Sequence, residues 1–394
     1  MKITDAVILA GGKGERIKKY LKGKPKPLAK IKNYIFLDLL IKKICKYNIG
    51  KLYILAGYKG TLIKKRYHKK KFNFVQVEVI IEKKPLGTAG CLSQLKKRTK
   101  NDLIVVNGDT FFDLDISKII NFNLKKNEIF LSLVKNTNYK SNKKLVFLNV
   151  DKKKRIVKKK NSNFINGGVY KFNNFFLKKL IKKNISLEND IIPDLINKKL
   201  VKGMIFKNFF LDIGTPRNFL SARKKLIKYT IKPALFLDRD NTLIHDHGYI
   251  YKTKDLKLKK TFIKYLKKIA LKKIYIFIVT NQSGIGRGYF TERQFENFQL
   301  NLKKKLFSLN IFLDDIEFCP YHKDAKIFKY RKKTNLRKPG NGMILKLLKK
   351  WPIDKSKSIM IGDQISDKIC AARSRIKFIN VNDKQIKNLS KKFV

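Results

Sequence analysis

The chain has 394 residues, more than one hydrophobic core usually organises, so its length favours two domains. Apolar residues make up 43% of the chain and it has only 21 Gly and 9 Pro, which excludes collagen-like and low-complexity proteins. Lys and Arg outnumber Asp and Glu by 93 to 29, and the resulting net charge of +64 taken alone favours a nucleic acid or another polyanion as partner.

Short apolar runs alternate with longer amphipathic segments from the beginning of the chain, which is typical of an α/β fold with a largely parallel sheet. Helices are expected at Phe36–Tyr47, Cys91–Lys97 and Ser221–Lys228. The strands expected in this first part are Asp5–Leu9, Lys51–Ala56, Val75–Ile81, Leu103–Asn107, Ile129–Val134, Leu145–Val150 and Gly168–Phe172.

A second series of strands begins after the segment Tyr229–Pro233. We therefore expect two α/β domains, residues 1–228 and 229–394, with no internal repeat. The strands expected in the second domain are Ala234–Leu237, Ile274–Thr280, Ile316–Cys319, Ser358–Ile361 and Lys377–Val381.

The positive charge is spread evenly over the two parts. Up to residue 226 there are 54 basic and 15 acidic residues, and beyond it 39 and 14, so the parts carry +39 and +25. Lys supplies 80 of the basic residues, although Arg binds phosphate better as a bidentate ligand. An even excess of Lys favours drift of the surface composition over a dedicated nucleic-acid surface. A basic protein that binds polyanions is the non-enzymatic alternative.

The four cysteines contain no Cys-x-x-Cys pair, which argues against a disulfide framework and fits a reducing compartment. The first apolar run, Ala6–Ala10, is too short for a signal sequence, and no run approaches the roughly 18 residues that cross a membrane. We expect a cytoplasmic protein without a membrane partner, and the sequence leaves its oligomeric state open.

A glycine-rich turn follows the first expected strand. Gly11, Gly12 and Gly14 leave backbone amides that could surround a phosphate chain. The turn lacks the third glycine of a dinucleotide-binding fold and the Gly-Lys-Ser/Thr of a P-loop, so alone it could be a simple tight connection. Prolines on both sides of Lys26 fix the backbone there, as expected of a cation that must meet a phosphate.

Acidic and small residues follow the later strands of the first domain. Asp109 comes at the carboxyl end of an expected strand, where open α/β sheets bind ligands. The other segments are Glu82–Gly90, Asn166–Gly168, Ser186–Glu188 and Leu211–Pro216. In this order and combination, about the first 226 residues resemble the sugar-1-phosphate nucleotidyltransferases.

That resemblance implies a GT-A-like domain with a Rossmann-like mixed sheet, in which a sugar 1-phosphate attacks the α-phosphorus of a nucleoside triphosphate and releases pyrophosphate. Such catalysis consists mostly of positioning and charge neutralisation. The resemblance implies that Gly11, Gly12 and Gly14 surround the nucleotide and that Arg16 and Lys26 neutralise its phosphates. Asp109 and Asp212 would bind Mg²⁺. Glu82 and Gly87 would contact the base and sugar, Asn166 and Gly167 the sugar, and Glu188 a sugar hydroxyl. Glu188 could equally be an ordinary acid at a helix start.

Carboxylates also follow two strands of the second domain, Asp238 and Asp240 after the first and Asp363 and Asp367 after a later one. Clustered carboxylates need a metal ion or a proton to coexist. Together with the segments around Thr280 and Lys338, they resemble the haloacid-dehalogenase-like (HAD) phosphatases, which have a Rossmannoid fold.

The HAD resemblance implies that Asp238 attacks phosphorus to form an aspartyl-phosphate. Asp240 would protonate the leaving oxygen and later activate water, while Thr280 and Lys338 would stabilise the transferred group. Asp238, Asp363 and the backbone carbonyl of Asp240 would hold Mg²⁺. Asp367 would support the loop.

Three segments of the second domain indicate a subfamily of these phosphatases. Asp246–Tyr249, Thr280–Thr291 and Arg337–Met343 look like those of the D-glycero-D-manno-heptose 1,7-bisphosphate phosphatases, with the histidinol-phosphate phosphatases as near relatives. Asn281 and Gln282 would contact substrate, and Arg337 would hold its remote phosphate as a planar fork.

Two features depart from that subfamily. Its members usually carry a structural zinc on four Cys and His ligands, but here Thr334 and Leu336 replace the later cysteines and only Cys319 and a displaced His322 remain, so we predict that zinc is absent. Asn241 replaces a glycine, at little expected cost because Asn tolerates the left-handed backbone region.

The two resemblances together predict a bifunctional enzyme of nucleotide-activated heptose synthesis, because loss of the 7-phosphate yields the heptose 1-phosphate that a nucleotidyltransferase consumes. The resemblance favours GTP as the nucleotide, and surface polysaccharide assembly as the destination of GDP-heptose. The enzymatic alternative is a hexose-1-phosphate nucleotidyltransferase fused to a histidinol-phosphate or other sugar-phosphate phosphatase.

Overall fold

The computed structural model describes residues 3–136, 147–160 and 162–393. It divides into two compact units, one of residues 1–45 and 49–226 and one of residues 46–48 and 227–394. Helix α8 (Pro216–Thr230) continues through residues 228 and 229, where the two domains were expected to meet. The limits of the functional domains therefore stay a prediction.

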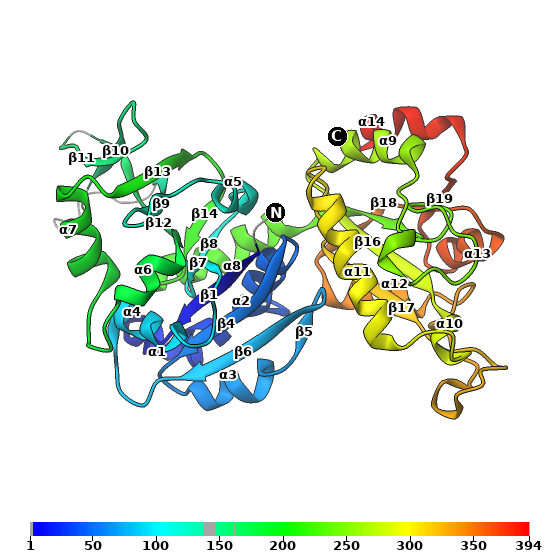
Figure 1. Ribbon diagram of the computed structural model, residues 1–394, viewed down its shortest axis with the longest axis horizontal. Helices are drawn as coiled ribbons and strands as arrows, with labels where there is room; N and C mark the ends of the chain where they lie inside the picture. The colour runs from blue at the N-terminus through cyan, green and yellow to red at the C-terminus, as the bar shows by residue number, and fades with distance from the viewer. Residues whose placement is uncertain (1–2, 137–146, 161, 394) are drawn as a thin grey trace. The chain divides into compact units, whose positions relative to one another are not determined.

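The first unit is built on a mixed sheet that has ten strands within the described residues (Figure 1). These strands are β1 (Thr4–Ala10), β4 (Ile49–Ala56), β5 (Lys71–Phe72), β6 (Val75–Ile81), β7 (Asp102–Asn107), β9 (Ile129–Lys135), β10 (Leu148–Val150), β11 (Ile156–Lys158), β12 (Phe164–Phe172) and β13 (Val201–Phe206). Parallel strands in the order β7-β1-β4-β6 form the middle, and β12 runs antiparallel beside β7. The middle strands are nearly continuous apolar runs because both faces are buried.

Helices connect the strands of the first unit. In α2, the buried side chains Leu37, Leu40, Ile41 and Ile44 recur every three or four residues and form one apolar face. Besides α8, the described helices are α1 (Lys18–Leu21), α2 (Phe36–Cys45), α3 (Gly60–Tyr67), α4 (Gly87–Gly90), α5 (Ile116–Ile120), α6 (Asn174–Lys179) and α7 (Ile192–Asn197), with 3-10 turns η1 (Glu15–Ile17), η2 (Lys26–Leu28) and η3 (Cys91–Leu95) and a π-helical turn η4 (Leu187–Ile191).

Two short strand pairs complete the first unit. The pair of β2 (Lys30–Ile31) and β3 (Tyr34–Ile35) is a small hairpin. The pair of β8 (Thr110–Phe112) and β14 (Phe210–Asp212) is antiparallel and joins segments far apart in the sequence.

The second unit has a fully parallel sheet in the order β17-β16-β15-β18-β19 (Figure 1). Its strands are β15 (Lys232–Leu237), β16 (Tyr275–Asn281), β17 (Asp315–Cys319), β18 (Ile353–Gly362) and β19 (Lys377–Asn380). The described helices are α9 (Lys260–Ala270), α10 (Ser283–Gly286), α11 (Glu292–Phe307), α12 (Gly342–Lys350), α13 (Ile365–Arg373) and α14 (Leu389–Lys392), with 3-10 turns η5 (Thr253–Asp255), η6 (Phe328–Tyr330) and η7 (Lys384–Asn388). Phe236, Phe277 and Trp351 pack together in one core of this unit.

The expected strands are confirmed, with their ends shifted by a few residues, although residues 145 and 146 of one of them lie outside the described residues. The helix expected at Cys91–Lys97 is instead the 3-10 turn η3, since so short a segment closes with i to i+3 bonds such as Lys96 N to Ser93 O (3.2 Å). Within the described ranges, no helix has both the length and the apolar character needed to cross a membrane.

Candidate active sites

A cavity of about 830 Å³ opens at the carboxyl ends of β1 and β7 in the first unit, a size that suits a nucleotide. Most of the residues predicted for the nucleotidyltransferase site line it, namely Gly11, Gly12, Gly14, Arg16, Lys26, Glu82, Gly87, Asp109 and Glu188. Residues from distant parts of the sequence therefore meet at the edge of the sheet where ligands bind in such folds.

The glycine-rich turn forms one wall of this cavity in a conformation that requires glycine. Gly14 has a φ of +70°, and a Cβ there would lie 3.0 Å from the Cβ of Lys26. A Cβ at Gly11 would lie 3.0 Å from Oε1 of Glu82. The turn therefore packs directly against two of the other predicted site residues.

Asp109 and Asp212 lie close together because β8 and β14 pair, with Thr110 opposite Asp212. The ammonium of the buried Lys26 lies 2.5 Å from Oδ2 of Asp109. Burial and the charge of Asp109 raise the pKa of Asp212, and Lys26 opposes this effect. Two carboxylates that repel each other beside residues predicted to bind phosphate are a donor set that fits Mg²⁺, a cation that prefers oxygen ligands.

Glu188 belongs to the first turn of η4 and also lines the cavity, and its contact with a sugar hydroxyl stays a prediction. Its carboxylate accepts hydrogen bonds from Thr88 Oγ1 (2.7 Å) and from the hydroxyl of Tyr170 (3.0 Å). Tyr170 is fully buried, and burial followed by the charge of Glu188 raises its pKa. Sequence reasoning assigned no role to Tyr170, which fixes the carboxylate of Glu188.

Asn166 and Gly167, expected at the sugar, lie on β12. Asn166 donates from Nδ2 to the hydroxyl of Tyr170 (2.9 Å) and accepts from the amide of Gly168 (2.8 Å). Both ends of its side chain are therefore bonded within the protein, and its contact with sugar stays a prediction.

A second cavity of the first unit, about 880 Å³ in volume, has Asp212 in its wall. Lys135, Lys159, Lys207 and Lys225 also line it, together with several Phe and Asn side chains. Because four lysines line it, the cavity suits an anionic ligand that also offers hydroxyl groups.

In the second unit, the carboxyl ends of β15, β16 and β18 meet at a cavity of about 280 Å³. These strands are neighbours in a parallel sheet, so the residues that follow them gather at one edge. The predicted residues that line the cavity are Asp238, Asp240, Asn281, Gln282, Lys338, Asp363 and Asp367, whereas Thr280 and Arg337 do not line it.

Lys338 is buried in the middle of this site. Its Nζ lies 2.5 Å from Oδ1 of Asp238 and 2.7 Å from Oδ1 of Asp367, and it donates to the carbonyl of Val279 (3.0 Å). Burial raises the pKa of Asp238, Lys338 opposes this effect, and Asp367 and Asp240 add to it. The ammonium of Lys338 therefore forms ion pairs with two buried carboxylates, those of Asp238 and Asp367.

Asp240 is held at both carboxylate oxygens. Oδ2 accepts from Gln282 Nε2 (2.7 Å) and from Thr280 Oγ1 (3.3 Å). Oδ1 lies 2.6 Å from Nη2 and 2.8 Å from Nε of Arg239, a side chain that is 2% exposed. Sequence reasoning missed Arg239, although a basic residue between two acids at the end of an apolar strand was a signal that could have identified it.

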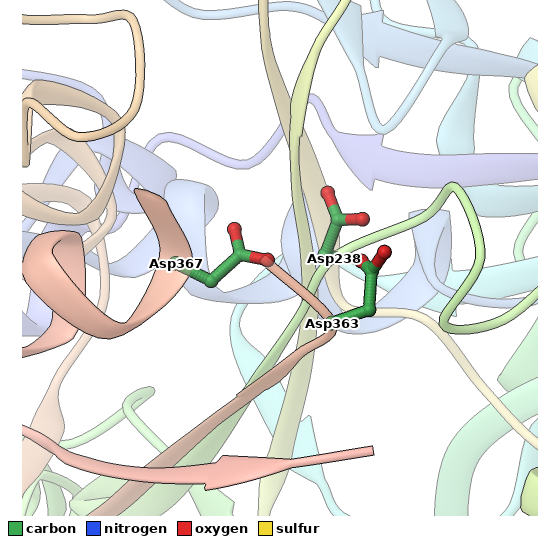
Figure 2. A group of neighbouring side chains, drawn as sticks. All are labelled: Asp238, Asp363 and Asp367. Carbon is green, nitrogen blue, oxygen red and sulfur yellow. The ribbon is translucent and has the colours of Figure 1, made fainter. Parts of the chain in front are cut away.

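Figure 2 shows Asp238, Asp363 and Asp367 grouped together, with oxygen atoms that lie within 4.8 Å of one another. The carboxylate of Asp367 forms an ion pair with Lys338 and accepts a hydrogen bond at Oδ2 from the amide of Gln364 (3.2 Å). This arrangement agrees with a supporting role for Asp367. Asp238 and Asp363 both line the cavity and, as oxygen donors, fit Mg²⁺.

Asn241, at the position of the subfamily's glycine, has a φ of +52°, so it adopts the left-handed conformation anticipated there. Its Oδ1 accepts from the amide of Asp246 (3.1 Å), which stabilises the turn locally.

The loop after β17 has a donor set that does not fit a tetrahedral zinc site. Cys319 is buried, with Sγ 3.9 Å from the carbonyl of Tyr321, and Nδ1 of His322 accepts a backbone amide proton. The loop is instead fixed by Tyr330, whose hydroxyl donates to Glu292 (2.7 Å). The absence of zinc stays a prediction.

Arg337, expected at a remote phosphate, is half-buried next to Lys338. Asn281 fixes the backbone here, since its side chain accepts from the amide of Lys338 and donates to its carbonyl, both at 3.0 Å.

Comparison with known proteins matches residues 5–229 to a family described as Nucleotidyl transferase and residues 233–394 to one described as Polynucleotide kinase 3 phosphatase. The D-glycero-alpha-D-manno-heptose 1-phosphate guanylyltransferase of Campylobacter jejuni is 33% identical over 224 residues, which cover 54% of this chain and 96% of the relative. The D-glycero-beta-D-manno-heptose-1,7-bisphosphate 7-phosphatase of Haemophilus influenzae is 37% identical over 144 residues, which cover 36% of this chain and 78% of the relative. A crystal structure of HddC from Yersinia pseudotuberculosis is 28% identical, covers 57% of this chain and all of that one, and superposes with a TM-score of 0.47.

Proposed function

Because the chain belongs to the nucleotidyl transferase family over residues 5–229 and, in its C-terminal part, to the family of the heptose-1,7-bisphosphate 7-phosphatases, we propose that it catalyses two consecutive steps of nucleotide-activated heptose synthesis. The second unit removes the 7-phosphate of a heptose 1,7-bisphosphate. The first unit then transfers a nucleotidyl group, GMP from GTP, to the resulting heptose 1-phosphate and releases pyrophosphate.

The observation that carries this proposal is that one chain contains both residue sets, each gathered at a cavity on the ligand-binding edge of its own sheet. The relatives' names describe reactions that follow one another, since the product of the phosphatase is the sugar phosphate used by the guanylyltransferase, apart from the anomer. Two such relatives within one chain favour a shared pathway over two unrelated sugar phosphates.

The anomer at C1 is the point at which the two groups of relatives differ. The guanylyltransferase relative is named for the alpha anomer and the phosphatase relative for the beta anomer. If the steps are consecutive, both units must accept one anomer. We propose the alpha anomer, because transfer to it gives the final product.

In the first unit, the glycine-rich turn surrounds the nucleotide while Arg16 and Lys26 neutralise its phosphates. A phosphate oxygen of the sugar 1-phosphate attacks the α-phosphorus, and the bond to the bridging oxygen breaks to release pyrophosphate. Asp109 and Asp212 would hold Mg²⁺. Glu188 lines the same cavity as the glycine-rich turn and Asp109, which supports placing the sugar phosphate there, with Glu188 bonding a hydroxyl.

In the second unit, Asp238 attacks the phosphorus of the 7-phosphate and Asp240 protonates the leaving sugar oxygen as the bond from phosphorus to that oxygen breaks. Asp240 then takes a proton from water, which attacks the aspartyl-phosphate and releases inorganic phosphate. Lys338 and Thr280 stabilise charge on the transferred group. Asp238, Asp363 and the backbone carbonyl of Asp240 would hold Mg²⁺ in the second unit. In each unit the bound Mg²⁺ would neutralise charge on the phosphate oxygens.

A direct test follows ³¹P NMR spectra of the full-length protein with D-glycero-alpha-D-manno-heptose 1,7-bisphosphate, GTP and Mg²⁺. We expect inorganic phosphate, pyrophosphate and a GDP-sugar. The beta anomer, ATP, CTP and dTTP serve as comparison substrates. Hydrolysis of histidinol phosphate in preference to the heptose bisphosphate would contradict the heptose assignment.

A 3′-phosphorylated oligodeoxynucleotide is a further comparison substrate, because the family matched by the second unit is named for a polynucleotide phosphatase and the chain carries a charge of +64. We expect its hydrolysis to be much slower than that of the sugar. Faster hydrolysis of the oligonucleotide would favour a polynucleotide phosphatase and contradict the heptose assignment.

A further inference from the structure

The loop that follows Asp240 borders the phosphatase cavity, and Asp246, Gly248 and Tyr249 from this loop line it. No step of the proposed reaction uses any of the three. With a volume of about 280 Å³, the cavity is smaller than most pockets that enclose a whole small molecule. It is large enough for a phosphate group and the carbon atoms next to it, so the rest of a sugar phosphate must lie over the rim of the cavity.

Hydrogen bonds within the loop fix its backbone. Oδ1 of Asn241 accepts from the amide of Asp246 (3.1 Å), and the ammonium of Lys259 donates to the carbonyl of Asn241 (2.8 Å). Oδ1 of Asp246 accepts from the amide of Ile250 (3.4 Å). Tyr249 has a φ of +53°, which a bulky side chain seldom adopts, and residues held in such conformations cluster at ligand-binding sites. The loop is therefore ordered before any ligand binds.

The half-buried carboxylate of Asp246 has room to accept a hydrogen bond from a ligand. The amides of Ile250 and Gly248 bond to it, but a carboxylate offers about four acceptor positions. Burial raises the pKa of Asp246, the charge of Asp240 adds to this effect, and the two amides and Arg239 oppose it. Because like charges repel, this acceptor favours a neutral hydroxyl donor over a further anion.

Two exposed tyrosine rings meet at the rim of the cavity. Tyr249, which lines the cavity, and Tyr289 are 45% and 48% exposed, and their ring centroids lie 4.6 Å apart. Tyr249 rests on α10, since a Cβ at Gly284 would lie 2.9 Å from its Cδ1. The face of an aromatic ring is partially negative and attracts C–H bonds that carry partial positive charge, as those of a sugar do. The rings therefore suit the part of a sugar phosphate that the cavity does not enclose.

We infer that Asp246 and Tyr249 bind the carbohydrate part of the phosphatase substrate. Asp246 accepts a hydrogen bond from the hydroxyl group on the carbon next to the phosphorylated one, and Tyr249, supported by Tyr289, packs on C–H bonds of the sugar. This inference rests on the proposed function, in which the substrate is a sugar phosphate, and it adds two specificity-determining residues. The second unit thereby selects phosphate monoesters of polyhydroxy compounds over simple alkyl phosphates.

The test compares kcat/KM for heptose 1,7-bisphosphate with that for n-propyl phosphate, which carries a phosphate but no hydroxyl group, from the release of inorganic phosphate. In D246N we expect the value for the bisphosphate to fall about ten- to hundredfold, because a hydrogen bond to a charged group is lost, and the value for n-propyl phosphate to stay within about twofold. Asparagine keeps an oxygen that can bond the amide of Ile250, so the loop is retained.

Y249A should lower the value for the bisphosphate about three- to tenfold and leave that for n-propyl phosphate within about twofold, because only the sugar loses its contact with the ring. D255N is the matched control for D246N. It removes an exposed acid of η5 that does not line the cavity, and both of its values should equal those of the wild type.

An unchanged ratio of the two values in D246N would overturn the inference, whether activity is retained or falls equally on both substrates. A similar fall of the ratio in D255N would also overturn it, since the effect would then be one of general charge. A wild-type protein that hydrolyses n-propyl phosphate but not the bisphosphate would contradict the proposed function, and the inference with it. The two failures are therefore distinguishable.

Discussion

Replacing Arg239 with lysine should lower kcat of the phosphatase about tenfold while KM stays within twofold. Nη2 and Nε of Arg239 lie 2.6 and 2.8 Å from the same oxygen of Asp240, and lysine can replace only one of these contacts. A hydrogen bond to a charged group contributes about 1.5–3 kcal/mol. The side chain of Asp240 is 22% exposed, so water restores part of the loss, and about 1.4 kcal/mol in orienting the acid corresponds to a tenfold change in rate.

R239M extends this test, because it removes both contacts and should lower kcat about a hundredfold. Its free energy of unfolding should fall by about 3 kcal/mol, because Asp240 loses the cation at Oδ1 and keeps only the hydrogen bonds of Gln282 and Thr280 at Oδ2. Steady-state kinetics with p-nitrophenyl phosphate and urea unfolding measure the two effects. If both variants kept the wild-type kcat, Arg239 would have only a packing role, and the proposal that it orients Asp240 would be refuted.

Three further predictions concern other parts of the chain. Y170F should raise KM for heptose 1-phosphate about fivefold but leave KM for GTP within twofold, because Glu188 loses a donor; equal changes in pyrophosphate-release assays would contradict this. G14A should lower the free energy of unfolding by about 1–2 kcal/mol, because Gly14 has a φ of +70°. G12A should lower it less, since no atom lies near the position of its Cβ. Equal losses for the two variants in urea unfolding would contradict this prediction. Elemental analysis should find substoichiometric zinc, and a zinc chelator should leave Tm unchanged; a lower Tm would show that the loop binds zinc.

The sequence was informative about strands and about the residues that follow them. Apolar runs such as Ala234–Leu237 are local signals, and a parallel sheet places whatever follows its strands at one edge. This is why Asp109, Asp238 and Asp363 could be assigned to cavities before their distances were known. In a parallel sheet, residues that follow different strands in the sequence therefore meet at one site.

Contacts between distant side chains could not be predicted in this way. Tyr170 meets Glu188 and Asn166 only once β12 and η4 are in place, and nothing in its sequence neighbourhood marks it. Helix α3 also gave no clear signal, because Ile63 and Tyr67 are its only buried large side chains and a run of basic residues separates them. Long lysine stems can cover apolar surface, which weakens the amphipathic pattern on which helix prediction depends.

Complementation between two single-site variants tests the central claim most directly. D238N should lose only phosphate release and D109N only nucleotide transfer, because each aspartate belongs to a different unit. With the alpha heptose 1,7-bisphosphate, GTP and Mg²⁺, neither variant alone should form GDP-heptose, and an equimolar mixture should form it through the released heptose 1-phosphate. A mixture that yields no GDP-heptose, or a single variant that yields it unaided, would contradict the account.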